Sequence, residues 1–338
     1  MKKVSVIGAG SWGTALASVL ADNGYQVWLH SKDDHVANEI MNHHTNAKYL
    51  PNTLLPTSLS CSSSMKEVVE HAEFVLFVVP SHAMRQVAKQ VAPYLDKDAL
   101  VAHASKGIEI ETSKTMSVVL KEELSSVISS PIVVFSGPSH AEEVILKHPT
   151  AIVAACEELE LAKKVQKLFM NPYLRVYTNT DVVGVEIGGS LKNIIALAAG
   201  LSDGLGFGDN AKAALLTRGL AEITRLGVKM GADPLTFSGL TGIGDLIVTG
   251  TSKHSRNWRT GNLLAQGKTL DEALEEIGMV AEGVKTTKAA HLISQHLQVE
   301  LPITNQLYAL LFEQKDPRQA VKDLMERNKV NEWYHLDS

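Results

Sequence analysis

The stretch VIGAGSWG, residues 6–13, decides the fold of this chain. The apolar run KVSVIG (3–8) predicts a buried strand before it, and residues 12–23 predict a helix after it. A glycine-rich turn that follows a strand and opens a helix is the context of a dinucleotide-binding loop. The alternative, a glycine-rich turn that holds no ligand, is disfavoured by this context.

The three glycines of this turn, Gly8, Gly10 and Gly13, form the pattern G-x-G-x-x-G. The first glycine permits the tight turn, the second lets the backbone approach a pyrophosphate, and the third lets helix and strand pack closely. The free amides and the dipole at the start of the helix favour phosphate binding there. The sequence therefore predicts a dinucleotide cofactor.

Outward from this turn, short apolar runs alternate with helical stretches as far as residue 180. Such alternation predicts β-α-β units and a parallel-rich sheet with helices on both faces. After Asp181 the pattern becomes helical, with glycine and proline between the runs and no convincing strand. We expect a Rossmann-type α/β domain that binds NAD(P) over residues 1–180, followed by an all-α domain with substrate and catalytic residues over 181–338. The expected strands are 3–8, 25–30, 73–79, 99–105, 131–137, 150–156 and 174–180.

The composition is that of a soluble globular protein, with 45% hydrophobic and 20% charged residues among 338. A net charge of −5 argues against a general nucleic-acid surface. The two cysteines, Cys61 and Cys156, have no metal-ligand spacing and suit reduced core residues of a cytoplasmic protein. We expect no membrane insertion, because no apolar stretch reaches the length of a membrane span, and no metal, because the thirteen histidines are scattered.

The end of the second predicted strand bears on the choice between NADP(H) and NAD(H). An acidic residue at this position would hold the ribose hydroxyls of NAD. The sequence instead has Ser31 and Lys32, followed by Asp33 and Asp34. A hydroxyl and a cation suit a 2′-phosphate, so we expect NADP(H) with NAD(H) tolerated. A simply solvated Lys32 remains an alternative.

A lysine interrupts the apolar helical stretch EIGGSLKNIIALAAG, residues 186–200. Helical spacing places Lys192 on a face with Gly188, Gly189, Ala196, Ala199 and Gly200. Glycine weakens a helix interior, so close approach of a ligand or of another backbone is the expected reason for it. A surface lysine is the alternative, and room for a small substrate beside the amine is our hypothesis.

Three further stretches, at strand ends or in loops, carry chemistry. Lys106 follows the strand at 99–105, and Gly137 and Ser139 follow the strand at 131–137. Ligands in open α/β sheets bind beyond the carboxyl ends of strands. The stretch 239–261 carries Asp245, Thr249, Ser255, Arg256 and Asn257. A guanidinium beside hydrogen-bonding side chains suits a phosphate.

Taken together, six motifs resemble those of the bacterial NAD(P)-dependent glycerol-3-phosphate dehydrogenase family. They run in order from residue 8 to residue 286, so the likeness covers nearly the whole chain. The motifs are GAGSWGTALA, SKGIE, SGPSHAEEV, EIGGSLKNIIALAAG, GIGDLIVTGTSKHSRNWRTG and VAEGVKT.

The resemblance implies an oxidoreductase that reversibly reduces dihydroxyacetone phosphate to sn-glycerol 3-phosphate, a precursor of phospholipids. We also expect a cytoplasmic homodimer, although the apolar helical faces late in the chain suit either core or a dimer interface. Lys192 would be the general acid/base, a role open to lysine when burial and nearby cations lower its pKa. The implied substrate-binding residues are Lys106, Gly137, Ser139, Lys192, Asp245, Ser255, Arg256 and Asn257. The cofactor-binding residues, from the glycine pattern, the second strand and the resemblance together, are Gly8, Gly10, Ser11, Trp12, Gly13, Ser31, Lys32, Lys106, Ala141, Arg256, Val280 and Glu282.

Two other functions fit parts of the pattern. An NAD(P)-dependent 3-hydroxy acid dehydrogenase of the same architecture would also carry a lysine followed by asparagine on a helix between domains. It would not need the SKGIE stretch or the basic SRN segment. A non-catalytic NAD(P)-sensing regulator is disfavoured by the acidic net charge and the absence of a DNA-reading segment.

Overall fold

A computed structural model describes residues 3–278, 280–329 and 331–332. The chain forms two compact units. The first, called here the α/β unit, comprises Met1–Lys106 and Lys114–Val182. The second, the helical unit, comprises Gly107–Ser113 and Val183–Ser338. The short segment Gly107–Ser113, called here the strap, therefore belongs with the helices although the sheet surrounds it in sequence.

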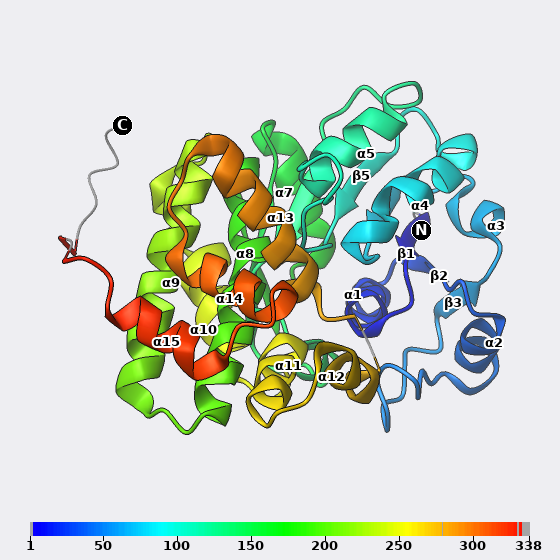
Figure 1. The fold of residues 1–338 in the computed structure, drawn as a ribbon. Helices are drawn as coiled ribbons and strands as arrows, with labels where there is room; N and C mark the ends of the chain where they lie inside the picture. The colour runs from blue at the N-terminus through cyan, green and yellow to red at the C-terminus, as the bar shows by residue number, and fades with distance from the viewer. Residues whose placement is uncertain (1–2, 279, 330, 333–338) are drawn as a thin grey trace. The chain divides into compact units, whose positions relative to one another are not determined.

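Within its described residues, the α/β unit holds one eight-stranded sheet in the order β3-β2-β1-β4-β5-β6-β7-β8. Figure 1 labels β1, β2, β3 and β5 of this sheet. All seven expected strands are confirmed, each within a few residues of the expected range. The strands are β1 (Lys3–Ile7), β2 (Gln26–His30), β3 (Leu59–Ser62), β4 (Phe74–Phe77), β5 (Leu100–His103), β6 (Val133–Ser136), β7 (Thr150–Ala155) and β8 (Leu174–Asn179).

The sheet differs from the expectation in two places. The strand β3 was not expected, because its sequence LSCS is short and half serine, which suits an edge strand better than a buried one. The strand β7 runs antiparallel to β6, whereas the other neighbouring strands are parallel. The sheet is thus parallel-rich, with one reversal between β6 and β7.

The strand β1 lies between β2 and β4, and Val4 pairs with Val27 on one side and with Phe74 on the other. From β1, the strands β2 and β3 follow on one side, and β4 and the later strands follow on the other side. The order of the sheet therefore switches between β1 and β4. The crevice beyond the carboxyl ends of the strands at such a switch is where open α/β sheets bind ligands. The glycine turn starts at Gly8, directly after β1.

Helices cover both faces of the sheet, because residues in the strands point alternately to either side. In β4, Phe74 and Leu76 pack into one core cluster, and Val75 and Phe77 into another. The first cluster takes residues from α1 (Ser11–Asp22), α2 (Asp34–His43), α6 (Ala141–Ile145) and α7 (Leu159–Phe169). The second takes residues from α3 (Met65–Val69), α4 (Met84–Val91) and α5 (Met116–Leu124).

The helical unit is built around α8 (Val182–Gly204), and its described residues contain no strand, as expected. Ile187, Leu191 and Ile194 of α8 lie in the core of this unit, together with Ile108 of the strap. The other α-helices are α9 (Asp209–Lys229), α10 (Asp245–Thr251), α11 (Arg256–Ala265), α12 (Leu270–Ile277), α13 (Glu282–Leu297), α14 (Pro302–Phe312) and α15 (Pro317–Met325).

The expectation that no apolar stretch would reach the length of a membrane span was wrong for α8. This helix has 23 residues, and its most apolar window has a mean hydropathy of 1.5. However, 89% of that window is buried inside the protein. Burial on all sides explains the apolar sequence of α8, because a helix that is surrounded by other helices has no hydrophilic face.

A buried carboxylate joins α9 to α14. Glu222 is 4% exposed, and its carboxylate accepts hydrogen bonds from the backbone N–H groups of Ile303 (2.6 Å) and Thr304 (3.2 Å). The hydroxyl of Thr304 donates a third, of 3.1 Å. These contacts cap the start of α14, whose first N–H groups have no partner within the helix. Burial outweighs the bonds and raises the pKa of Glu222 to about 7.

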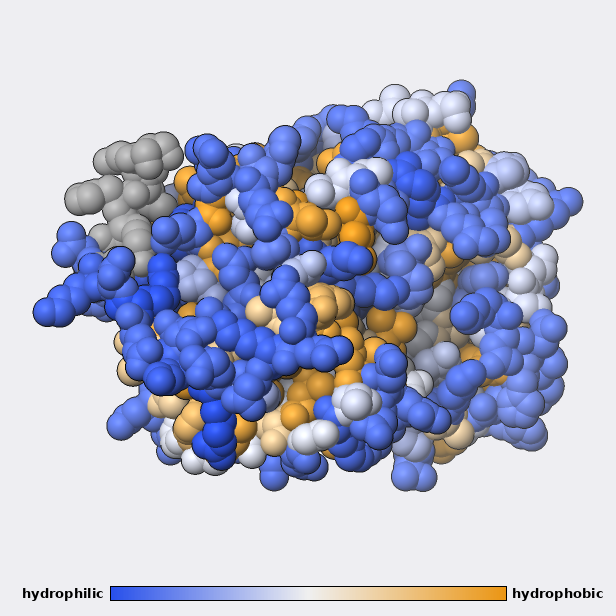
Figure 2. Space-filling view, in the orientation of Figure 1, coloured by the Kyte–Doolittle hydropathy of each residue, from blue (hydrophilic) through white to orange (hydrophobic). Residues whose placement is uncertain are grey.

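The two cysteines are buried and free, as expected. On the face drawn in Figure 2 the surface is mostly hydrophilic, with hydrophobic side chains reaching the surface over α13 and α14. Leu292 of α13 and Phe312 of α14 are 40% and 38% exposed.

Candidate active site

The glycine turn has the backbone geometry that the sequence predicts. Gly8 has a φ of +117°, which disfavours any residue with a side chain. A Cβ on Gly13 would lie 1.9 Å from the carbonyl oxygen of Gly8, so this glycine allows α1 to pack against the end of β1. A Cβ on Gly10 would have nothing within 4 Å. The first and third glycines therefore serve the fold, and the second faces open space.

The start of α1 is suited to an anion. Gly10 is its N-cap and makes no side-chain cap, and no acidic residue lies in the first turn. The hydroxyl of Ser11 donates to the carbonyl of Tyr49 (2.9 Å). The indole N–H of Trp12 is buried and has no hydrogen-bond partner among the described residues. Open amides, the helix dipole and an unused donor fit the pyrophosphate of a dinucleotide.

The end of β2 leads into a tight turn. The hydroxyl of Ser31 donates to the carbonyl of Asp33 (2.9 Å) and accepts its N–H (3.1 Å), so this donor is already used within the turn. Lys32 is exposed. A second cation, Lys48, lies 3.0 Å from the carboxylate of Asp33. Sequence reasoning missed Lys48, which lies 15 residues further along the chain.

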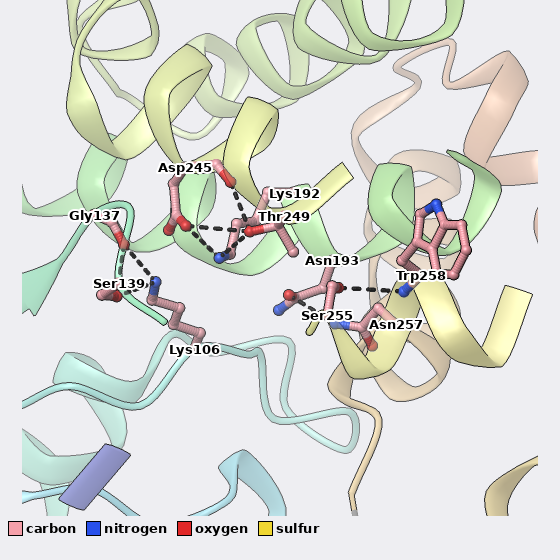
Figure 3. A network of polar contacts seen from close by, with 10 residues as sticks. All are labelled: Lys106, Gly137, Ser139, Lys192, Asn193, Asp245, Thr249, Ser255, Asn257 and Trp258. Carbon is pink, nitrogen blue, oxygen red and sulfur yellow. Dashed lines mark hydrogen bonds and ion pairs between the residues drawn. The ribbon is translucent and has the colours of Figure 1, made fainter. Parts of the chain in front are cut away.

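In the α/β unit, the expected strand-end residues Lys106, Gly137 and Ser139 meet (Figure 3). The ammonium of Lys106 donates to the carbonyl of Gly137 (2.9 Å) and lies 3.5 Å from the hydroxyl of Ser139. That hydroxyl donates to the same carbonyl (2.8 Å). Gly137 has a φ of +142°, and its missing Cβ would lie 3.0 Å from Ile152. The carboxyl ends of β5 and β6 thus present a cation and a hydroxyl together.

In the helical unit, Lys192 is 6% exposed and forms a buried ion pair with Asp245, which is fully buried (Figure 3). Its ammonium also donates to the hydroxyl of Thr249 (2.8 Å). The alternative of a surface lysine is therefore wrong. Because a buried charge is costly unless it is paired and hydrogen-bonded, Asp245 and Thr249 offset the cost of burying this lysine.

Two of the small residues around Lys192 allow another backbone to approach closely. A Cβ on Gly188 would lie 2.4 Å from the carbonyl oxygen of Thr241, and one on Gly200 would lie 1.8 Å from that of Trp258. Of the two expected reasons for these glycines, close approach of another backbone is the correct one at both positions. The hypothesis that this small face leaves room for a substrate is wrong there, because protein fills the space.

Most of the stretch 239–261 is helical, whereas it was expected at strand ends or in loops. A π-helical turn, Leu240–Gly244, leads directly into α10, and Asp245 and Thr249 lie one turn apart on that helix. Gly242 makes the wide turn possible, because a Cβ there would lie 1.9 Å from the carbonyl oxygen of Phe237. The i, i+4 spacing of Asp245 and Thr249 places both on the side of α10 that meets Lys192.

The SRN segment forms the start of α11. Ser255 is the N-cap, and its hydroxyl accepts the N–H of Trp258 (3.2 Å). Arg256 is exposed, whereas Asn257 is 7% exposed. The amide of Asn257 donates to Asn193 Oδ1 (2.9 Å), and its oxygen accepts the backbone N–H of Gly283 (2.8 Å). Sequence reasoning did not assign Asn193, although it directly follows Lys192.

Three further expected cofactor contacts lie at helix starts or beside one. Ala141 is the first residue of α6 and is buried, and Glu282 is the first residue of α13. Val280 precedes α13 by two residues and is half-buried. Among the described residues, no group of three or more histidine, cysteine, aspartate or glutamate side chains could hold a metal ion.

Sequence profiles of one family match both units. The profile for the N-terminus of NAD-dependent glycerol-3-phosphate dehydrogenase matches residues 3–162, and the profile for its C-terminus matches residues 181–322.

Individual relatives are also named as glycerol-3-phosphate dehydrogenases. The chain is 57% identical over 334 residues to a protein of Lysinibacillus sphaericus named glycerol-3-phosphate dehydrogenase [NAD(P)+], covering 98% of both chains. It is 56% identical over 339 residues to the Bacillus subtilis protein of that name, covering 99% of this chain and 97% of the other. The chain is also 40% identical in sequence to glycerol-3-phosphate dehydrogenase from Coxiella burnetii. Its crystal structure matches this structure with a TM-score of 0.92, and the match covers 96% of this chain and 99% of the other.

Proposed function

Since this chain belongs to the NAD-dependent glycerol-3-phosphate dehydrogenase family, we propose that it reversibly reduces dihydroxyacetone phosphate to sn-glycerol 3-phosphate with NAD(P)H. The product is a precursor of phospholipids, which places the enzyme in lipid metabolism. The observation that carries the proposal is the buried Lys192, bonded to both Asp245 and Thr249.

Lys192 is the proposed general acid/base. Reduction of a ketone builds negative charge on its oxygen, so a nearby ammonium stabilises that charge and donates the proton. Asp245 and Thr249 accept two hydrogen bonds from this ammonium and hold it in a fixed direction. In the reverse reaction, the amine form takes the proton of the alcohol.

The phosphate of the substrate requires cations and N–H donors. We assign this binding to Arg256, Asn257 and Ser255 at the start of α11, where backbone N–H groups also favour an anion. In the α/β unit, Lys106, Gly137 and Ser139 are the proposed substrate contacts, and Lys106 is a cofactor contact as well.

The cofactor is NADP(H) or NAD(H), which supplies the hydride when bound. The open space at Gly10, the unused N–H of Trp12 and the uncapped start of α1 fit its pyrophosphate. Ser11, Ala141, Val280 and Glu282 are proposed to lie against the cofactor, as is Arg256. We propose a preference for NADP(H), which the exposed cation Lys32 supports.

Two other functions are less well supported. The names of the relatives favour the glycerol-3-phosphate reaction over a 3-hydroxy acid dehydrogenase or a non-catalytic NAD(P) sensor. The buried ion pair of Lys192 also has no evident use in a protein that only binds the cofactor.

The first test is the decrease of NADPH absorbance with dihydroxyacetone phosphate, run beside unphosphorylated dihydroxyacetone. We expect oxidation with the phosphorylated ketone and much less with the other. Lys192→Ala should lower kcat by at least about 100-fold, as the loss of a general acid does. The exposed Lys229 on the same unit gives the matched control, Lys229→Ala, which should keep wild-type turnover. Near-normal turnover of Lys192→Ala would remove this lysine from the mechanism.

The proposal also extends to a cytoplasmic homodimer. A cavity of about 530 Å³ in the helical unit, lined mainly by apolar side chains such as Leu215, Leu310 and Leu324, supports an interface there. Free, buried Cys61 and Cys156 suit a reducing compartment. Light scattering after size-exclusion chromatography gives the mass directly, and a monomer at micromolar concentration would contradict the dimer.

A further inference from the structure

A chain of two side-chain amides links three helices of the helical unit. The backbone N–H of Gly283 on α13 donates to Asn257 Oδ1 on α11 (2.8 Å). Asn257 Nδ2 then donates to Asn193 Oδ1 on α8 (2.9 Å). Both side chains are buried, with Asn193 6% and Asn257 7% exposed. We call this chain the amide relay.

The relay has only one consistent polarity. A backbone N–H is always a donor, so Gly283 requires the oxygen of the Asn257 amide to face it. The nitrogen of that amide must then face Asn193, which in turn presents its own oxygen. Reversal of the Asn257 amide would break both hydrogen bonds and bring two pairs of like groups together in a buried place, which is costly.

The position of Gly283 explains why its N–H takes part. It is the second residue of α13, so its N–H has no partner within the helix, and the N-cap residue, Ala281, makes no side-chain cap. A Cβ on Gly283 would lie 2.6 Å from the backbone oxygen of Asn193 and 2.8 Å from Asn257 Oδ1. The glycine therefore allows α13 to begin directly against α8 and α11.

We propose that Asn193 and the Gly283 N–H are positioning groups that hold Asn257 with a donor toward the substrate phosphate. This inference rests on the proposed function, in which Asn257 binds that phosphate. The relay uses the oxygen and one N–H of the Asn257 amide, which leaves one N–H. A phosphate accepts hydrogen bonds and repels an amide oxygen, so the fixed polarity makes Asn257 attractive to an anion.

The relay thus favours a phosphorylated substrate by fixing the orientation of the Asn257 amide. A freely rotating amide would present its oxygen to the phosphate part of the time and would lose binding energy. Loss of Asn193 should weaken the affinity for the phosphorylated ketone more than it slows the hydride step, because Lys192 keeps its own partners, Asp245 and Thr249.

The experiment measures KM for dihydroxyacetone phosphate, kcat, and the inhibition constant of inorganic phosphate, which probes the phosphate subsite alone. In Asn193→Leu, we expect KM and the inhibition constant to rise together by about tenfold, the effect of a hydrogen bond to a charged group. The kcat value and the dissociation constant of NADPH should change less than about threefold. The matched control is Asn210→Leu at an exposed position of α9, which should leave all four quantities unchanged.

The isosteric variant Asn257→Asp provides a second measurement if Asn193→Leu folds poorly. Its carboxylate still accepts the N–H of Gly283 but offers no donor, so KM and the inhibition constant should rise by at least as much. In a double-mutant cycle with Asn257→Leu, the change at Asn193 should add little further, because the relay is already broken.

An unchanged inhibition constant for phosphate in Asn193→Leu would contradict the inference that the relay positions Asn257. Additive effects of Asn193→Leu and Asn257→Leu in the double-mutant cycle would also contradict it. A fall in kcat with an unchanged KM would also overturn it, since that pattern places Asn193 in the chemical step. Failure of the wild-type protein to oxidise NADPH with dihydroxyacetone phosphate would instead contradict the proposed function, so the two failures are distinguishable.

Discussion

The hydroxyl of Thr249 accepts a 2.8 Å hydrogen bond from the ammonium of Lys192 and donates its own proton to the backbone carbonyl of Asp245 at 2.7 Å. The proton of the hydroxyl is therefore committed within α10, and its lone pairs face the lysine. A threonine at this position acts as an acceptor of fixed direction, beside the carboxylate that carries the compensating charge.

Replacement of Thr249 tests this fixed acceptor. Thr249→Val keeps the shape but leaves one N–H bond of a buried ammonium without an acceptor, at a cost of roughly 1.5–3 kcal/mol. We expect kcat/KM for dihydroxyacetone phosphate to fall by about tenfold or more in steady-state assays. Thr249→Ser keeps the hydroxyl and should stay within about threefold of the wild type. Equal losses in both variants would show that packing, rather than the hydroxyl, matters here.

Two glycines of the cofactor turn, Gly10 and Gly13, should respond differently to alanine. Gly10→Ala adds a Cβ into open space, so the free energy of unfolding should change by less than about 1 kcal/mol. Its methyl group would, however, occupy the approach of the pyrophosphate, and we expect the dissociation constant of NADPH to rise about tenfold. Gly13→Ala would place a Cβ 1.9 Å from the Gly8 carbonyl and should destabilise the fold by more than about 2 kcal/mol.

Titration of NADPH by fluorescence and urea unfolding measure these two effects separately. A Gly10→Ala variant that binds NADPH as tightly as the wild type would remove this glycine from the cofactor site.

Charge reversal at Lys32 tests the cofactor preference. This side chain is exposed, so Lys32→Glu should leave the free energy of unfolding nearly unchanged. A carboxylate repels the 2′-phosphate of NADPH and accepts the ribose hydroxyls of NADH, so the ratio of kcat/KM for NADPH over NADH should fall by about tenfold. The preference ratio is measured with both cofactors at subsaturating concentration. If the ratio is unaltered, Lys48 or a backbone group sets the preference.

Glu222 predicts a pH dependence of stability. Its pKa of about 7 in the folded protein exceeds the ordinary value of 4.5, so the folded protein binds this proton more tightly than the unfolded chain. Its contribution to stability is therefore fully present below about pH 4.5 and is lost as the pH rises through about 7. The wild-type free energy of unfolding should therefore decline between about pH 5 and about pH 8, a range that brackets the folded pKa. Glu222→Gln cannot ionise, so its free energy of unfolding should not show this decline.

Glu272 offers a control of opposite sign. Its carboxylate accepts the backbone N–H of Thr269 (2.8 Å) in a capping box at the start of α12, and this hydrogen bond lowers its pKa below 4.5. Glu272→Gln should therefore lose stability at neutral pH, and its difference from the wild type should shrink as the pH falls below the ordinary pKa. Urea unfolding at several pH values measures both variants. Parallel pH profiles for Glu222→Gln and the wild type would contradict the assignment.

Features that depend on neighbouring residues in sequence could be predicted from the sequence. The glycine turn, the seven apolar strands and the change to helices near residue 180 are local patterns of hydrophobicity and of glycine. The edge strand β3 could not be predicted, because its serines interrupt any apolar run. The reversal of β7 could not be predicted either, because parallel and antiparallel strands do not differ in local composition.

The candidate site divides in the same way. Lys106, Gly137 and Ser139 follow strand ends, so topology places them together. The partners of Lys192 lie 53 and 57 residues away on another helix, and nothing local indicates that they meet. Gly188 and Gly200 show the limit most clearly, since their sequence signal is correct but only the fold reveals that backbones, and not a substrate, fill the space.

The strap determines whether the two units can be expressed as separate fragments. Because Gly107–Ser113 belongs to the helical unit, neither unit is encoded by one uninterrupted piece of sequence. A fragment that begins at Val183 would lack Ile108, a 2% exposed member of the helical core, and would carry a hole in its place. A fragment that ends at Val182 would expose the same isoleucine to water. Separate expression of the two halves should therefore yield poorly soluble proteins, whereas co-expression could restore each from the other.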